Sequence, residues 1–443
     1  MSNKHKILIG TFVLTATGFL TRFIGFFFRM FLSHAFGEEQ VGLYQLIFPI
    51  YALCFSFSCA GIETAISRTT ARKISIGKKD ESVQLLYVGI IVSLFLSFFS
   101  MILLQNYALD FSVHILGDVR CTSMLTAISY ALPFASVHSC IVGFYLGLKQ
   151  TKIPAISQLL EQLIRIMTVY IIYLFCQKHN YEVSILFAVI GIVFGEICSS
   201  FFCVYYFTSH IKCFKISHYI PNLFTHTKEL LQLSTPLTGS RILLNILQSV
   251  ESISIPLRLQ IYGYSSSMAL SNYGVLMGMA LPCILFPSAI TNSVSTMLLP
   301  TVAEIQAGNN YQRLKDLIQK IFFYCFLLGT FCFLLFFIFS SFIGIFLFHS
   351  TLVADYLKTL SWICPFLYLN TTLISVVNGL GKTNISFIIN MFALSIRILC
   401  VLFMIPKIGM QGYLWGLLSS QFFTFLLCVL FLLSYLKKKE SFH

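Results

Sequence analysis

Residues 133–166 read PFASVHSCIVGFYLGLKQTKIPAISQLLEQLIRI, and the chain contains a second version of this stretch. At a constant offset of 232, residues 365–398 read PFLYLNTTLISVVNGLGKTNISFIINMFALSIRI. Ten of the 34 positions are identical, whereas chance in a chain so rich in Ile, Leu and Phe would give roughly three, so we infer a duplication. The same offset pairs Gly42 with Gly274. The protein is therefore predicted to have two related halves, with its functional site between them.

The composition is that of an integral membrane protein. Hydrophobic residues make up 57% of the 443 residues and charged residues only 10%, and the mean hydropathy is +0.85. These values exclude an ordinary soluble domain. The 14 cysteines are scattered singly through apolar runs without metal-ligand spacing. We expect them to be small core residues, and we predict no metal site and no cofactor.

Long apolar runs predict about twelve transmembrane helices of ~20 residues or more and no strands, because a strand of a membrane barrel needs only ~10 residues. The predicted fold is all-α, with two parallel six-helix repeats around a central cavity. The predicted lobes are residues 1–210 and 230–443, joined by a polar cytoplasmic linker over 211–229. The helices are expected at 7–32, 41–67, 83–105, 121–147, 153–176, 181–207, 230–257, 269–299, 317–348, 355–379, 383–405 and 411–436.

The distribution of Lys and Arg predicts the orientation. With the N-terminus in the cytoplasm, the inside segments hold 19 of these residues and the outside segments hold five, which is a clear positive-inside bias. Both termini are therefore expected in the cytoplasm. The net charge of +13 indicates topology and contact with anionic lipids, not nucleic acid.

Two predicted helices carry a polar stripe with identical spacing. In helix 7–32 it comprises Thr11, Thr15, Gly18, Arg22, Gly25 and Arg29, and in helix 230–257 it comprises Ser234, Thr238, Arg241, Asn245, Gln248 and Ser252. One interpretation is close helix packing through small residues with polar side chains between helices. Arg22 and Arg241 favour a watery cavity, because a charge at mid-membrane costs at least ~2.5 kcal/mol and usually faces water or a partner.

The predicted substrate-binding side chains come from these stripes. They are Arg22, Arg29, Arg241, Asn245 and Gln248. Arg29 lies nearer the outer end of its helix. An alternative role for its side chain is to extend the guanidinium group to the membrane–water interface.

The remaining intramembrane charges have other predicted roles. Glu161 and Arg165 are spaced i, i+4 in the order that favours a structural ion pair. Arg397 is the repeat counterpart of Arg165, but Ala393 stands where the Glu would be, so its partner must come from another helix. The candidates for ion or proton coupling are Glu251, Glu63 and Glu196, with Glu251 first because it borders a polar stripe.

No catalytic motif is visible, so we expect a protein that is not an enzyme. The sequence contains no GxxxxGK[ST] nucleotide-binding loop. Asp110 and Asp118 on a predicted outer loop are better interpreted as solvated acids.

The run GFLTRFIGFFFRMFLSHAFGEEQVGLYQLIFPIYALCFSFSCAGIETAISRTTARKISIGKK, residues 18–79, resembles the opening of bacterial polysaccharide and peptidoglycan-precursor exporters. These belong to the multidrug/oligosaccharidyl-lipid/polysaccharide (MOP) superfamily, and the chain is most similar to the stage V sporulation protein B group, related to lipid II flippases. The elements that carry the resemblance are Arg22, Gly25, Arg29, Gly37, Gly42-Leu43-Tyr44, Gly61-Ile62, Ala65-Ile66-Ser67 and the later GLGKT at 379–383.

The resemblance implies alternating access that moves an undecaprenyl-diphosphate-linked saccharide from the cytoplasmic to the outer leaflet. It also implies that Arg22 and Arg29 contact the diphosphate. Two departures stand out: many lipid II flippases have fourteen helices, and Asn390 and Ser395 are accompanied by no acid where some relatives hold sodium.

The resemblance further implies a bacterial plasma-membrane location and partners among cell-wall or polysaccharide synthesis enzymes. Two alternatives remain open. A cation-coupled multidrug antiporter of the same fold would bind cations through buried carboxylates, and the arginines of the first helix disfavour it. A membrane scaffold without transport would tolerate loss of the polar stripes.

Overall fold

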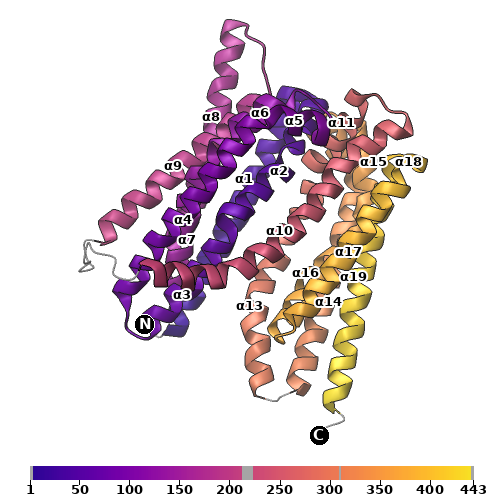
Figure 1. The fold of residues 1–443 in the computed structure, drawn as a ribbon. Coiled ribbons are helices and arrows are strands. Elements are labelled where there is room, and N and C mark those ends of the chain that lie inside the picture. The colour runs from indigo at the N-terminus through magenta and orange to yellow at the C-terminus, as the bar shows by residue number, and fades with distance from the viewer. Residues whose placement is uncertain (1–2, 212–222, 309–310, 441–443) are drawn as a thin grey trace. The chain divides into compact units, whose positions relative to one another are not determined.

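The computed structural model describes residues 3–211, 223–308 and 311–440, and every regular element in these ranges is helical (Figure 1). Ten described helical segments are long and apolar enough to cross a membrane, or eleven if the bent pair Cys121–Ser129 and Ala131–Gly147 forms one span. The all-α polytopic fold is thus confirmed. The predicted linker 211–229 lies largely outside the described residues, except for Ile211 and the start of the helix that begins at Leu223.

The first of these segments, Thr15–Ser75, contains both of the first two predicted helices. It is 61 residues long, and a straight helix of that length would measure about 90 Å, roughly three times the thickness of the hydrocarbon layer. Helix α1 (Asn3–Leu46) is broken at Gly37, whose φ of 79° and ψ of 170° are not helical. Glycine is the residue that adopts this conformation without a Cβ clash. The chain therefore turns at Gly37, and α1 consists of two helical parts on either side of this residue.

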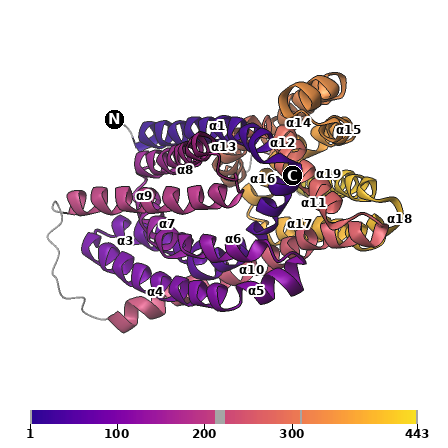
Figure 2. The same ribbon diagram turned by 90° about the horizontal axis from the view of Figure 1, so that it is seen from above.

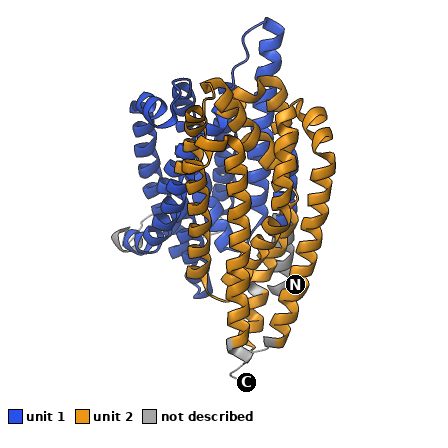
Figure 3. Cartoon of the chain, turned by 90° about the vertical axis from the view of Figure 1, so that its right-hand side faces the viewer, with its two compact units in different colours: residues 1–25, 43–249 blue, residues 26–42, 250–443 orange. Residues whose placement is uncertain are grey.

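The chain forms two compact units (Figure 3). Unit 1 contains residues 1–25 and 43–249, and unit 2 contains residues 26–42 and 250–443. Each long helix, α1 and α10 (Leu223–Tyr262), contributes to both units. The predicted lobes 1–210 and 230–443 follow the sequence repeat, whereas the compact units divide the chain at other residues. The lobe boundaries therefore stay a prediction.

Unit 1 is built from helices that pack around one apolar core, which includes Ile66, Leu86 and Phe144. Helix α7 lies against α3, α4 and α9, and α8 lies along α9 (Figure 2). Its elements after α1 are α2 (Phe48–Phe55), the π-helical η1 (Ser56–Ala60), α3 (Gly61–Ser75), α4 (Lys79–Asn106), α5 (Ala108–Asp110), η2 (Phe111–Leu116), α6 (Cys121–Ser129), α7 (Ala131–Gly147), α8 (Lys152–His179) and α9 (Leu186–Ile211).

Unit 2 has its own core, which includes Val302, Leu373 and Cys428. Large apolar side chains such as Phe323, Ile338 and Phe346 are exposed on its helices, as expected for surfaces that face lipid. Its elements are α11 (Ser266–Gly274), η3 (Val275–Ala280), α12 (Leu281–Leu285), α13 (Ser288–Ala307), α14 (Tyr311–Phe342), η4 (Ile343–Leu347), α15 (Thr351–Leu360), η5 (Ser361–Ile363), α16 (Cys364–Gly379), α17 (Thr383–Phe403), α18 (Ile405–Ile408) and α19 (Met410–Glu440).

Charged contacts attach the start of α10 to unit 1. Glu229 accepts a hydrogen bond from Arg72 and lies 3.2 Å from the Nζ atom of Lys73, both on α3. Lys73 in turn donates to Glu81 at the start of α4, at 2.8 Å. These contacts, together with Leu230 in the apolar core of unit 1, join the first part of α10 to the helices of the first half of the chain.

The same close helix contact occurs in both units at positions 232 apart. A Cβ built on Gly147 would lie 2.6 Å from the carbonyl oxygen of Ser67, and one on Gly379 would lie 2.9 Å from that of Leu299. Because both pairs obey the offset found in the sequence, the packing of α7 on α3 has its counterpart in the packing of α16 on α13. Small residues at such contacts let helix backbones approach closely.

A second contact joins the two sequence repeats directly, within unit 2. A Cβ on Gly42 would lie 2.1 Å from the carbonyl oxygen of Leu270, and one on Gly274 would lie 2.3 Å from that of Glu38. The offset of 232 relates Gly42 to Gly274 and Glu38 to Leu270, so each contact maps onto the other. Around these glycines the packing is therefore symmetric under exchange of the two repeats.

We predict that alanine at either glycine destabilises the protein by a similar amount. The methyl group of Gly42→Ala or Gly274→Ala would meet a backbone oxygen that cannot rotate away, and overpacking of this kind typically costs about 1–3 kcal/mol. The measurement is the thermal unfolding temperature of the purified protein in detergent.

The matched control is Gly239→Ala, because a Cβ at Gly239 would meet nothing within 4 Å. This helical substitution should leave the unfolding temperature unchanged or raise it slightly. Equal unfolding temperatures for the Gly42 and Gly239 variants would contradict the close contact.

Candidate functional site

The polar stripe of α1 carries two exposed arginines. Arg22 belongs to unit 1 and Arg29 to unit 2, and both side chains are exposed. Close to Arg22, a Cβ on Gly25 would lie 3.4 Å from the Nε2 atom of Gln162 on α8. The part of α1 that carries Arg22 therefore runs beside α8.

The polar stripe of α10 makes specific contacts within unit 1. Arg241 donates from Nη2 to the Oγ1 atom of Thr64 on α3, at 3.1 Å. The neighbouring Glu63 is close enough to Arg241 for the two charges to interact. Arg241 thus lies beside an acid and a hydroxyl of α3, and its side chain remains exposed.

Other members of this stripe pack against the broken helix α2–η1–α3. Asn245 donates from Nδ2 to the Oγ atom of Ser56 and, at 3.4 Å, to the carbonyl oxygen of Ala52. A Cβ on Gly61 would overlap the side chain of Thr238. Thr238 and Asn245 therefore take part in helix packing, whereas Gln248 is exposed. A binding role of Asn245 would require it to exchange these partners.

Glu251, the first coupling candidate, is buried in unit 2 and is only 4% exposed. Its Oε1 atom accepts a hydrogen bond of 2.7 Å from the hydroxyl of Tyr413 on α19 and lies 3.4 Å from the Nε atom of Arg397 on α17. The partner of Arg397 comes from another helix, as the missing glutamate at Ala393 indicated. Glu251 therefore links α10, α17 and α19.

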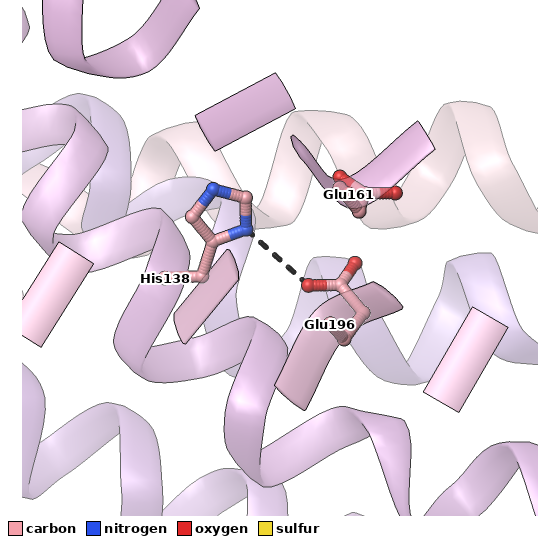
Figure 4. Close-up of side chains that lie close together, drawn as sticks. All are labelled: His138, Glu161 and Glu196. Atoms are coloured by element: carbon pink, nitrogen blue, oxygen red, sulfur yellow. Dashed lines mark hydrogen bonds and ion pairs between the residues drawn. The ribbon is translucent and has the colours of Figure 1, made fainter. Parts of the chain in front are cut away.

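Glu196, another coupling candidate, belongs to a group of three partly buried side chains in unit 1 (Figure 4). The potential ligand atoms of His138, Glu161 and Glu196 all lie within 4.8 Å of one another. His138 Nδ1 is 3.3 Å from Glu196 Oε2, and Arg165 donates to Glu161. Three helices, α7, α8 and α9, supply these residues.

Two glycines on α9 bring these helices together. Gly191 and Gly195 are four residues apart, a spacing that allows close approach of transmembrane helices. A Cβ on Gly195 would lie 2.9 Å from the carbonyl oxygen of Glu161, and one on Gly191 would lie 2.9 Å from that of Arg165. Glu196 follows Gly195 directly. The close contact at Gly195 therefore places the Glu196 carboxylate near the Glu161–Arg165 pair.

Sequence reasoning missed His138. The histidines are dispersed along the chain, and nothing in their spacing distinguishes this one. The available signal was that His138 lies inside the repeated stretch, where its counterpart is the neutral Asn370. Only the packing of α7 on α9 places it beside two acids that are distant in sequence.

Comparison with known families agrees with this architecture. The profile of the family described as "Polysaccharide biosynthesis protein" matches residues 7–306, and the MatE profile matches residues 242–403. Stage V sporulation protein B of Bacillus subtilis (strain 168) is 26% identical over 415 residues, which cover 92% of this chain and 80% of that protein.

Solved structures share the fold. The lipid II flippase MurJ, in an inward closed conformation, gives a TM-score of 0.72 at 17% identity, covering 95% of this chain and 87% of that one. An inward-facing multidrug resistance MATE family transporter of the MOP superfamily gives a TM-score of 0.69 at 14% identity, with 96% of each chain covered. With a family profile that spans more than half of its length, the chain belongs to the family described as polysaccharide biosynthesis protein.

Proposed function

We propose that this protein is a membrane flippase that moves a polyprenyl-diphosphate-linked saccharide from the cytoplasmic to the outer leaflet by alternating access. The observation that carries the proposal is the exposed arginine of α1, Arg22, on a polar helix face that contains no acid before Glu38. Fixed positive charge suits a diphosphate, because the planar guanidinium group makes paired, charge-assisted hydrogen bonds to such oxygens.

The chemistry of such a substrate fits the polar stripes and the apolar outer surfaces of the helices. A lipid-linked saccharide has a polar head, a charged diphosphate and an apolar tail. The polar stripes of α1 and α10 suit the head and the diphosphate, and the tail can remain in lipid. A lipid II flippase is among the structural relatives, and a stage V sporulation protein is a sequence relative.

The proposed setting is the plasma membrane of a bacterium, with both termini in the cytoplasm. Enzymes of cell-wall or polysaccharide synthesis would supply the substrate and use the product. Anionic lipids would contact the basic cytoplasmic loops.

A cation-coupled multidrug antiporter is the second candidate. The MatE profile match and the MATE transporter fold favour it. Its substrates are attracted to carboxylates and repelled by arginine, so the charge on α1 separates the two proposals. A deletion strain that still flips lipid-linked saccharide but no longer exports cationic drugs would favour the antiporter.

We predict that Arg22→Ala abolishes transport at normal protein levels, because the diphosphate loses its main fixed positive charge. Arg22→Lys should restore transport only in part, since an ammonium group lacks the planar fork. The measurement is the appearance of lipid-linked saccharide in the outer leaflet of a strain that depends on this protein.

The control is Arg120→Ala. Arg120 is exposed beside α6, and its Nη2 atom lies 2.8 Å from Asp118. Its removal deletes an arginine without touching α1, so transport should continue. Full transport by Arg22→Ala would refute the role proposed for Arg22.

A second prediction separates charge from packing at Arg241. If Arg241 contributes positive charge to the substrate path, Arg241→Ala should lower transport about tenfold or more, the effect of losing a charge-assisted hydrogen bond worth ~1.5–3 kcal/mol. Thr64→Val removes only the hydroxyl that accepts from Arg241 and should retain most of the transport. Equal losses in the two variants would show that the contact between α10 and α3 matters and the charge does not.

A further inference from the structure

The cluster of α7, α8 and α9 contains a histidine whose two ring nitrogens both face hydrogen-bond acceptors. His138 Nδ1 lies 3.3 Å from Glu196 Oε2 and 3.4 Å from the Oγ atom of Ser199. His138 Nε2 lies 3.1 Å from the Oγ atom of Ser157. Cys203 on α9 is a further hydrogen-bond partner of the ring. The protonation state of the ring depends on what these partners donate.

Each serine hydroxyl also has a backbone acceptor. Ser157 donates its hydroxyl proton to the carbonyl oxygen of Pro154, at 3.0 Å, and Ser199 donates to that of Glu196, at 3.1 Å. Each hydroxyl oxygen is then left with lone pairs toward the imidazole. A neutral imidazole donates from only one nitrogen, whereas an imidazolium donates from both. With the serine protons on these carbonyls, the hydrogen-bond pattern matches a His138 with two ring protons, one of which is donated to Glu196.

The charges of the cluster balance in the same state. Arg165 compensates Glu161, to which it donates a hydrogen bond, and the His138 imidazolium compensates Glu196. Loss of the second ring proton would leave two carboxylates, Glu161 and Glu196, beside one cation, Arg165, although the Glu196 side chain is only 12% exposed. An unpaired buried charge is strongly unfavourable.

Arg165 interacts with both acids of the cluster. Helix α3, which also packs on α7, carries Arg68, Arg72 and Lys73, and the last two pair with Glu229. Helices α4 and α6 also pack on α7, and residues 82–106 and 121–129 contain no charged side chain. Arg241 lies near Glu63. The other titratable groups that face the cluster are Tyr44 on α1, Tyr51 on α2, Cys59 on η1, Glu63 on α3 and Cys203 on α9.

The second repeat provides an internal comparison. The offset of 232 replaces His138 by Asn370 and Glu161 by Ala393. Asn370 donates from Nδ2 to the carbonyl and side-chain oxygens of Gln421, both at 2.8 Å. The counterpart position is thus occupied by a neutral group with fixed hydrogen bonds, so the titratable pair is specific to the first repeat.

We propose that His138 and Glu196 form a proton-binding site inside unit 1, with the proton held between α7 and α9. The ligand is a proton, which arrives from water and leaves to water without any change in other covalent bonds. Release of the proton removes the charge-assisted contact between α7 and α9 and leaves the Glu161 and Glu196 carboxylates beside one cation, Arg165. Occupancy of the site is therefore linked to the packing of these two helices.

The test observes the ring directly and needs no substrate. Full-length protein in detergent is labelled with ¹⁵N-histidine, and nitrogen spectra are recorded at a pH of about 7.5. We expect one imidazolium signal that disappears in His138→Asn, the residue found at the equivalent position of the second repeat. The control variant His114→Asn, in η2 outside this cluster, should retain that signal.

Glu196→Gln should convert the His138 signal to that of a neutral ring, because the compensating carboxylate is lost. A neutral His138 in the parent protein, or an imidazolium signal that survives Glu196→Gln, would overturn the proposal. Replacement of choline chloride by sodium chloride should change nothing. Loss of the imidazolium signal on adding sodium would overturn the assignment in favour of an alkali-cation site.

A transport measurement extends the test and rests on the proposed function. A pH gradient across the membrane should alter the rate of saccharide flipping by the parent protein and leave the rate of Glu196→Gln unaltered. If the nitrogen spectra give the expected result and saccharide does not move, the proton site stands and the proposed substrate falls. Equal response to the gradient in both proteins would exclude Glu196 from coupling.

Discussion

A charge that enters the hydrocarbon layer needs an opposite charge or a hydrogen-bond partner beside it, and helix packing in this protein supplies such partners. Glu251 meets Arg397 and Tyr413, Glu161 meets Arg165, and Glu196 meets His138. Two of these three contacts join different helices and need them at close range. The glycines on α9 therefore do more than save space, because they bring the charged side chains of α8 and α9 within reach of each other.

The two arginines that the sequence repeat relates illustrate what can and cannot be predicted. For Arg165, the i, i+4 spacing to Glu161 is local, and the pair is visible in the sequence. For Arg397, the absence of a local acid predicts only that the partner lies on another helix. That the partner is Glu251 depends on the packing of α10 on α17, which no local pattern contains. The helical class and the repeat offset were likewise predictable, because hydrophobic run length and sequence identity are both local or directly countable.

Other features depended on three-dimensional packing. Asn245 belongs to a regular polar stripe, yet its amide is hydrogen-bonded to the broken helix at Ser56 and Ala52. A stripe of polar residues has the same spacing whether it faces water or another helix, so its spacing could not distinguish the two. The compact units were also not predictable from the repeat, because α1 and α10 each pass through both units.

The reciprocal contact of Gly42 and Gly274 allows the two halves of the chain to diverge in sequence at other positions. Contacts in which each copy offers the same patch to the other are those of a symmetric dimer of identical chains. Once both copies belong to one polypeptide, a substitution in one copy no longer appears in the other. The shared contact can stay matched while distant positions diverge. A histidine among acids at position 138 and an asparagine hydrogen-bonded to Gln421 at position 370 are two outcomes of that freedom: the first side chain can bind a proton, and the second is neutral.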